Sequence, residues 1–335
     1  MKIVILYLIL MLGMINESFS QDVHFSNYSA VPVFLNPATT GFFDGKFRLI
    51  TAYKSQWGSF ANPYKTFYSS LDVNFSDGKV TNKIIGASLS FYNDKAGTSQ
   101  MGTSQANLSV ACNIQLNENN FLGAGIKAGI AQMSYSTNIL WDSQYSNGII
   151  DPGVPSGESN LNSSFNYLDF GTGLLWSFNG ENELKSTTGI SVNKTSSPFL
   201  PGAIDRPYKI AIHSTAQIPI SNGSTFLIPY FSYINHTPNQ EFNIGSIFKY
   251  DMGLNSKYTG RNFASAVYLG AIYRYQDAVI VITKLDLKQF LSLSFSYDIN
   301  VSALNVASQR NGGPELSISY IGHIKGRSKT DKTFL

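Results

Sequence analysis

The fold of this sequence is decided by two neighbouring stretches, KFRLITAYKSQW at residues 46–57 and YKTFYSSLDVNF at residues 64–75. Apolar and polar side chains alternate along both, and a period of two places each set on one face of a β-strand. Phe47, Leu49 and Tyr53, for example, share one face of the first strand. Each stretch has roughly the 9–11 residues, or slightly more, that a tilted strand needs to cross a bilayer. Together they predict an amphipathic, membrane-spanning β-hairpin.

Such a hairpin needs neighbours on both edges, and closure of the sheet into a barrel removes the edges altogether. The alternation continues along the chain and predicts fourteen strands, at approximately residues 46–57, 64–75, 82–94, 98–115, 119–135, 165–179, 186–196, 207–220, 223–235, 241–256, 261–276, 278–288, 289–299 and 313–322. Two weaker segments, 186–196 and 278–288, leave twelve strands as the alternative. Pro219 and Pro229 count against their segments, because proline lacks the N–H that a strand ladder uses. We predict an all-β fold, a transmembrane antiparallel β-barrel over residues 45–322.

The composition is typical of a membrane barrel. Charged residues form 13% of the 335 residues, about half the usual globular share, and the chain holds 19 tyrosines and 23 phenylalanines. An apolar outer band, aromatic girdles and a polar lumen produce this balance. The net charge of +3 is too small to indicate nucleic-acid binding. Cys112 is the only cysteine, which excludes a disulfide within the chain.

Residues 1–20 have the pattern of a secretory signal peptide. Lys2 precedes the apolar run Ile3–Ile15, and the small residues Ser18 and Ser20 stand at positions minus three and minus one of the expected cleavage site. An apolar run of about 13 residues is too short for a comfortable transmembrane helix. We expect cleavage after Ser20 and export of the mature chain to the outer membrane.

Residues 21–44 precede the first strand and lack its alternation. Pro32, Pro37 and Gly41 interrupt the segment, and Asn36-Pro37 predicts a turn, because the residue before a proline is pushed out of the helical region. We expect a structured, non-strand arm at one mouth of the barrel or tucked into it. A disordered leader is the alternative.

Motifs near both ends of the chain carry a resemblance. The opening motifs are, in order, Gln21-Asp22, His24-Phe25-Ser26, Pro32, Asn36-Pro37-Ala38, Gly41, Arg48, Tyr53, Gln56-Trp57, Tyr64 and Ser70-x-Asp72. The closing motifs are Tyr297-Asp298 and GPELSISY at residues 313–320. Together they resemble the PorP/SprF family, outer-membrane proteins of Bacteroidetes associated with type IX secretion and gliding motility. Residues 100–280 match this family only in general character.

The resemblance implies an outer-membrane barrel that serves a secretion or adhesin-display machine and is not an enzyme. The implied partners are outer-membrane lipid, periplasmic and outer-membrane proteins of the machine, and a secreted adhesin-type protein. The barrel architecture taken alone supports an alternative, a passive or ligand-taking pore.

The motifs that carry chemistry in other proteins are absent or misplaced in this sequence. The glycine-rich run Gly123–Gly129 lies within a strand pattern, whereas a dinucleotide fingerprint requires a turn between strand and helix. The four histidines, at positions 24, 213, 236 and 323, are too scattered to predict a metal site. No nucleophile elbow or catalytic constellation stands out. We therefore expect no catalytic residues, no metal site and no cofactor.

Four charged residues form a candidate cluster in the lumen. The hairpin register places Arg48 opposite Asp72 or Asn74 on the polar face. Asp298 and Glu315 face the lumen on the last two strands, across the closure of the barrel. An arginine fork can hold two carboxylates, so we expect Arg48 at the centre of a cluster with Asp72 and either Glu315 or Asp298. Separate, hydrated charges of little energetic weight are the alternative.

Two further segments carry expectations. Residues 136–164 form the longest connection, rich in Asn, Ser, Gly and Pro, and long barrel loops usually face outside. This segment is a candidate partner-contacting loop, with a variable solvated loop as the alternative. Residues 323–335 carry four Lys or Arg side chains and no apolar period, which predicts a flexible periplasmic tail.

Overall fold

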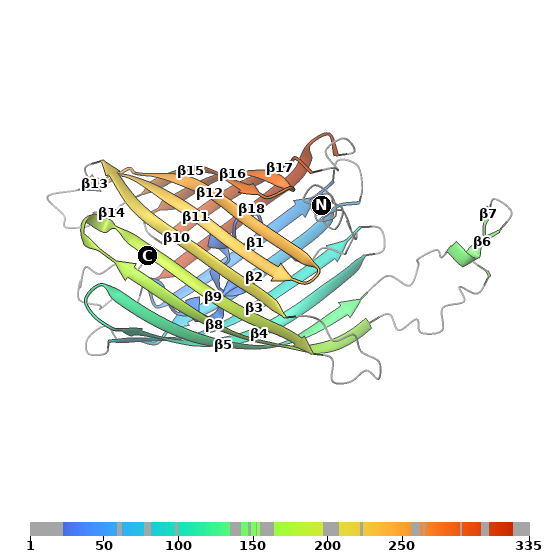
Figure 1. The fold of residues 1–335 in the computed structure, drawn as a ribbon, viewed down its shortest axis with the longest axis horizontal. Helices are drawn as coiled ribbons and strands as arrows, with labels where there is room; N and C mark the ends of the chain where they lie inside the picture. The colour runs from blue at the N-terminus through green and yellow to red at the C-terminus, as the bar shows by residue number, and fades with distance from the viewer. Residues whose placement is uncertain are drawn as a thin grey trace, which may run out of the picture.

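Fourteen antiparallel strands close into a barrel (Figure 1). The computed structural model describes residues 23–58, 62–76, 82–97, 100–134, 142–146, 149–151, 153–154, 164–196, 208–221, 224–255, 262–263, 265–288, 290–302 and 308–323. The expected signal peptide and all but the first residue of the basic tail therefore lie outside the described residues. The barrel strands are β1 (Phe47–Gln56), β2 (Tyr64–Asn74), β3 (Lys83–Ala96), β4 (Met101–Gln115), β5 (Asn120–Ser134), β8 (Ser164–Asn179), β9 (Lys185–Ser196), β10 (Lys209–Ser221), β11 (Thr225–His236), β12 (Asn239–Asp251), β15 (Ala266–Arg274), β16 (Ala278–Leu287), β17 (Leu291–Asn300) and β18 (Asn311–Gly322).

The predicted fold class is confirmed, and each of the fourteen predicted segments overlaps one of the fourteen strands. The largest differences are at β12, which ends at Asp251 and not at 256, and at β15, which begins at Ala266 and not at 261. Each strand pairs with its sequence neighbours in the wall, and β1 pairs with β18 to close the ring. The alternation that predicts the strands also sets their faces. Leu49 and Leu71 stand 45% exposed on the outer face, whereas Arg48 and Asp72 are buried in the lumen.

Pro219 and Pro229 count against their segments, yet both lie within strands, as the predicted segments 207–220 and 223–235 require. Pro219 lies in β10 at a register shift toward β11 that ends at Ser221. Pro229 lies in β11, opposite a gap in the ladder to β10. In that ladder Thr215 and Ile218 of β10 are paired with β11, but the two residues between them are not. One of those omitted residues is the one opposite Pro229. A proline fits because the ladder is interrupted where its N–H is missing.

The two ends of the barrel differ in their connections. At the terminal mouth, where β1 begins and β18 ends, several turns are short, such as residues 116–119 and 288–290. The connection between β12 and β15 is longer and holds the strand pair β13 (Leu254–Asn255) and β14 (Asn262–Phe263). At the opposite end, the far mouth, residues 135–163 form the longest connection.

The long far-mouth connection contains its own small hairpin. It consists of the 3-10 helix η3 (Asp142–Gln144) and the strands β6 (Tyr145–Ser146) and β7 (Ile149–Ile150). Figure 1 shows this hairpin standing clear of the barrel strands. Short turns face the periplasm and long loops face outside in bacterial barrels of this type.

Residues 23–44 form a non-strand arm that lies inside the barrel. The arm contains η1 (Tyr28–Ala30), α2 (Pro32–Leu35) and η2 (Pro37–Thr39), drawn in dark blue within the ring of strands in Figure 1. Pro32 and Pro37 each occupy the first position of a helix, where a missing N–H costs nothing. Within the described ranges, no helix is long and apolar enough to span a membrane.

The arm supplies much of the buried apolar core. One cluster joins Phe25, Tyr28 and Val31 to wall residues such as Ile50 and Tyr68. A second cluster joins residues near the end of the arm to β3, β5 and β8, and its members are Ala38, Phe42, Ile84, Phe121 and Leu175. The lumen of this barrel is thus occupied by the chain's own N-terminal arm.

Candidate functional site in the lumen

The arm is anchored to the wall at Asn36, which is fully buried. Its side-chain oxygen accepts the N–H of Ala38 at 2.9 Å and so caps η2. Its amide nitrogen donates to the carbonyl of Leu174 in β8 at 3.0 Å and lies 3.1 Å from Nε2 of His213 in β10. One side chain therefore shapes the turn of the arm and ties it to two strands.

Lumen-facing glycines make room for this turn. A Cβ on Gly125 of β5 would lie 2.5 Å from the carbonyl oxygen of Pro37, and a Cβ on Gly173 of β8 would collide with the side-chain oxygen of Asn36. Gly86 of β3 packs in the same way on Gly41 of the arm. The glycine-rich run that superficially matches a dinucleotide loop thus lies in β5 and is part of this wall.

Gly41 itself is required at its position. Its φ of +72° is a left-handed conformation that residues with a side chain rarely adopt. A Cβ there would also meet the backbone of Gly86 at 2.5 Å. We call residues 36–44, with the glycines that they contact, the fixed half of the arm.

An ion pair closes the fixed half near the terminal mouth. Nη2 of Arg48 lies 2.6 Å from Oδ2 of Asp72, and the other oxygen of Asp72 accepts the N–H of Gly41 at 2.8 Å. The guanidinium of Arg48 also lies 4.6 Å from the ring centre of Phe43. β1, β2 and the arm are therefore joined through two buried charges.

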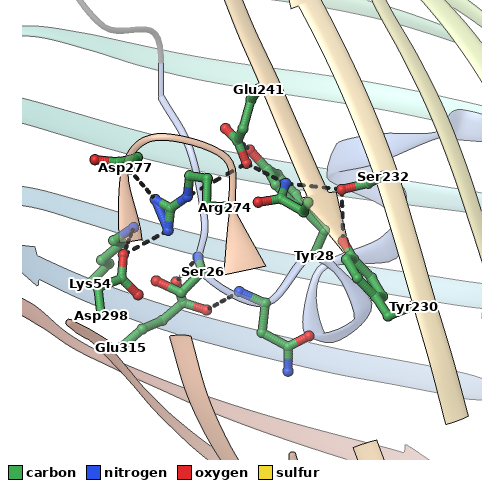
Figure 2. A network of polar contacts seen from close by, with 12 residues as sticks. Ser26, Tyr28, Lys54, Tyr230, Ser232, Glu241, Arg274, Asp277, Asp298 and Glu315 are labelled. Atoms are coloured by element: carbon green, nitrogen blue, oxygen red, sulfur yellow. Dashed lines mark hydrogen bonds and ion pairs between the residues drawn. The ribbon is translucent and has the colours of Figure 1, made fainter. Parts of the chain in front are cut away.

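A second charged group lies toward the far mouth, and Figure 2 shows it from close by. Asp298 contacts Nζ of Lys54 at 3.3 Å and Nη2 of Arg274 at 2.7 Å. Arg274 also contacts Asp277 at 3.2 Å and Glu241 at 4.0 Å. We call these residues, together with Glu315, the far-mouth network.

The far-mouth network holds the beginning of the arm. Glu315 is buried, and its two carboxylate oxygens accept the N–H groups of Ser26 at 2.6 Å and Asn27 at 3.3 Å (Figure 2). The hydroxyl of Tyr28 donates to Glu241 at 3.3 Å. The wall therefore holds this part of the arm through the main-chain N–H groups of Ser26 and Asn27 and through the side chain of Tyr28.

The expected single cluster around Arg48 is wrong in part. The structure brings Arg48 and Asp72 together, but Asp298 and Glu315 belong to the far-mouth network. The closure register is the reason, because Arg48 stands opposite Ile321 while Glu315 stands opposite Lys54. Six residues along β1 separate the two positions by about 20 Å.

Sequence reasoning missed several members of the far-mouth network, notably Lys54, Arg274 and Glu241. Lys54 is an even number of residues from Arg48 in β1, so the alternation of the strand predicts that both side chains face the lumen. The main-chain donors of Ser26 and Asn27 carry no side-chain signature.

Aromatic rings fill the space around residues 23–35. Phe34 packs edge-on against Phe25, Tyr68 and Tyr92, with ring centres 5.1, 5.8 and 5.6 Å apart. Nζ of Lys209 lies 5.3 Å from the ring centre of the same residue. These rings close the lumen between the arm and β2, β3 and β10.

Packing around residues 23–35 is nevertheless incomplete. Two cavities, of about 70 and 150 Å³, border this part of the arm. Both are lined by Val23, Tyr28, Lys209, Ile234 and His236. Neither is lined by any residue of the fixed half. We call residues 23–35 the cavity-lined half of the arm.

Two other motif positions lie at the rim of the barrel. Trp57 and Tyr64 flank the connection between β1 and β2 at the far mouth, with ring centres 5.0 Å apart in an edge-to-face pair. The N–H of Trp57 donates to the carbonyl of Gly312 at 2.7 Å. Unlike Asn36 and Pro37, these residues brace the hairpin and the closure rather than the arm.

Among the residues that the structure describes, no group of three His, Cys, Asp or Glu side chains is arranged to hold a metal ion. His213 faces Asn36 and contributes to anchoring of the arm. The arrangement in the lumen can hold a peptide segment, since polar groups of several strands bond to the arm.

Comparison with known proteins gives a family and a set of similar barrels. A family model described as type IX secretion system membrane protein PorP/SprF matches residues 17–320. No curated protein matches the sequence. The structure is similar to that of the CymD monoaromatic hydrocarbon channel, with 10% identity, coverage of 88% of this chain and 93% of that chain, and a TM-score of 0.46. It is also similar to a Pseudomonas aeruginosa FadL homologue, with 12% identity, coverage of 88% of this chain and 94% of that chain, and a TM-score of 0.44. A third similar structure is that of BamA from Haemophilus ducreyi lacking POTRA domains 1–3, with 11% identity, coverage of 83% of this chain and 70% of that chain, and a TM-score of 0.44.

Proposed function

The chain belongs to the PorP/SprF family of type IX secretion system membrane proteins, as its motifs predicted, and from this premise we propose that it is a plugged partner-binding scaffold. It resides in the outer membrane and serves export or surface anchoring of adhesin-type proteins in a secretion and gliding machine. Its role is to bind proteins of that machine, and it carries out no catalysis.

The observation that carries this proposal is the occupied lumen. Asn36, Ala38 and Thr40 of the arm are completely buried, and arm residues bond to β2, β8, β9, β10 and β18. A solute that entered at either mouth would meet these contacts, which join opposite sides of the wall. A barrel filled in this way is suited to presenting surfaces to partners rather than to conducting solutes.

The far mouth offers a surface for such partners. Tyr145, Ile149 and Ile150 of the β6–β7 hairpin are exposed, with Ile149 at 70%. Apolar side chains that project from a long loop into water are typical of protein-contact sites. This hairpin is the candidate contact for a partner at the cell surface.

Conductance and co-purification together test the proposal. The purified full-length chain in planar bilayers should show no steady open conductance, and a tagged chain should retain secretion-machine proteins from envelope extract, identified by mass spectrometry. A steady conductance without partners, combined with no specific co-purification, would favour the passive or ligand-taking pore instead.

A matched pair of variants locates the partner surface. Replacing Ile149 and Ile150 by serine should reduce co-purification, whereas Leu116→Ser should not. Leu116 is similarly exposed, at 60%, but lies in the β4–β5 turn at the terminal mouth. Equal retention of partners by both variants would exclude the hairpin as the contact.

A further inference from the structure

The cavity-lined half of the arm lies in a groove of the inner wall. Tyr68, Tyr92, Ala211 and Ile234 form its apolar side, and Glu315 forms its charged end. Phe25 and Phe34 occupy the apolar side, and Phe25 is completely buried. We call this surface the lumenal groove.

The recognition chemistry of the lumenal groove is that of a peptide site. Glu315 accepts two consecutive main-chain N–H groups, a contact that any peptide other than one with proline there can make. The neighbouring aromatic wall selects large rings, because edge-to-face pairs add to the energy of burial. Main-chain hydrogen bonds combined with side-chain pockets are a general mode of peptide capture.

The two halves of the arm are not equally committed to their places. The fixed half needs glycines on both sides of the contact, so no other sequence fits its channel easily. The cavity-lined half borders two cavities at the far mouth and makes no comparable glycine contact among the described residues. A segment that enters from the far mouth can therefore replace residues 23–35 while residues 36–44 stay anchored.

We propose that the lumenal groove is a peptide-binding site, occupied at rest by residues 23–35 and opened when an aromatic-bearing segment of a partner displaces them. The identity of the partner rests on the proposed function, but the groove and its occupant do not. In the resting chain the arm competes with any added peptide for the lumenal groove, because a tethered segment acts at an effective concentration of roughly millimolar.

A peptide in trans tests this proposal on the full-length chain. The probe is a fluorescent peptide of residues 23–35, VHFSNYSAVPVFL, added to purified protein in detergent and followed by anisotropy. A chain carrying both Phe25→Ala and Phe34→Ala should bind the probe at least about tenfold more tightly than the unaltered chain, because its own arm competes less well. Adding Glu315→Gln to that variant should weaken binding several-fold.

The matched control is Phe42→Ala, which truncates a buried phenylalanine in the fixed half that packs on Phe121. It should leave probe binding as weak as in the unaltered chain. A peptide of the same composition in scrambled order reports binding to detergent alone and should not distinguish the variants.

Equal binding of the probe by all variants, no binding by any of them, or equal binding of the scrambled peptide would overturn the proposal. If the double variant does not fold, as judged by heat-modifiable gel mobility, Phe34→Ala alone carries the test with a smaller gain. Retention of envelope partners without probe binding would refute the groove and leave the scaffold function standing. Probe binding without retention of partners would support the groove and refute the scaffold function.

Discussion

The two halves of the lumenal arm are held by different physics. Residues 36–44 lie against glycines of the wall, so that main chain packs on main chain. The buried Asn36 adds contacts to Ala38, Leu174 and His213. Residues 23–35 are held by aromatic rings and by Glu315, whose carboxylate accepts two N–H groups, with cavities beside them. Most residues of both halves are buried, so burial alone does not distinguish an anchor from a removable segment.

Close packing of backbones is what makes the difference. A glycine contact admits no alternative occupant, because even one added carbon atom collides with the wall. A carboxylate that holds main-chain N–H groups accepts many sequences. The comparison therefore separates the part of the plug that defines the fold from the part that is free to exchange.

The largest expected effect comes from the ion pair of the fixed half. Arg48→Ala leaves Asp72 buried without the cation beside it and should lower the free energy of unfolding by about 3–5 kcal/mol. Lys54→Ala should cost less than Arg48→Ala, because Asp298 keeps Arg274 at 2.7 Å. Urea unfolding in lipid vesicles measures both values. Equal losses would show that the two ion groups hold their halves alike.

The next effect concerns two asparagines with the same local role. Asn36 caps η2 and Asn27 caps η1, each by accepting an N–H two residues ahead. Asn36→Ala should cost about 2–3 kcal/mol, since it also removes the bond to Leu174 and strands His213. Asn27→Ala should cost about 1 kcal/mol, the usual value of a cap. The comparison of halves fails if Asn27→Ala is the more destabilising change in the same unfolding assay.

A single added methyl group probes the glycine wall. Gly125→Ala should cost about 1–3 kcal/mol, because its Cβ meets backbone atoms of Pro37 and Ala38 that cannot rotate away. Gly253→Ala, where nothing lies within 4 Å of the added atom, should be neutral. The midpoint of thermal loss of heat-modifiable mobility in detergent reports the difference. An unchanged midpoint for Gly125→Ala would mean that the arm does not press on β5.

The smallest effect is expected in the cavity-lined half. Glu315→Gln keeps an acceptor for the N–H of Ser26 but loses the charge that strengthens the bond, at a cost of about 1 kcal/mol. Glu118→Gln, exposed in the β4–β5 turn, is the control and should not change stability. A loss as large as that of Arg48→Ala would place Glu315 among the fixed anchors.

Local pattern was sufficient to predict the strands. Each strand reveals itself through its own alternation, so fourteen segments follow without knowledge of their neighbours. The Arg48–Asp72 pairing also follows, because a hairpin connection fixes the register of its two strands. Pro219 and Pro229 counted against strands that nevertheless form, because the ladder interruption that accommodates each proline depends on the neighbouring strand.

The register between β1 and β18 and the position of the arm in the lumen could not be predicted from local pattern. No turn joins β1 to β18, so the stagger of the whole barrel sets their register and moves Glu315 from Arg48 to Lys54. The arm was recognisable as non-strand from its prolines. Its position in the lumen depends on glycines in β3, β5 and β8, whose contact with residues 36–41 has no trace in local sequence.

Hydrogen–deuterium exchange of the intact chain in detergent, followed by mass spectrometry, tests the difference between the halves most directly. The amides of residues 36–44 should be protected to the same degree as those of the barrel strands. Peptides from residues 23–35 should exchange faster overall, and their slowest amides should be those of Ser26 and Asn27, which donate to the buried Glu315. Equal protection of the two halves, or faster exchange in residues 36–44, would contradict the account.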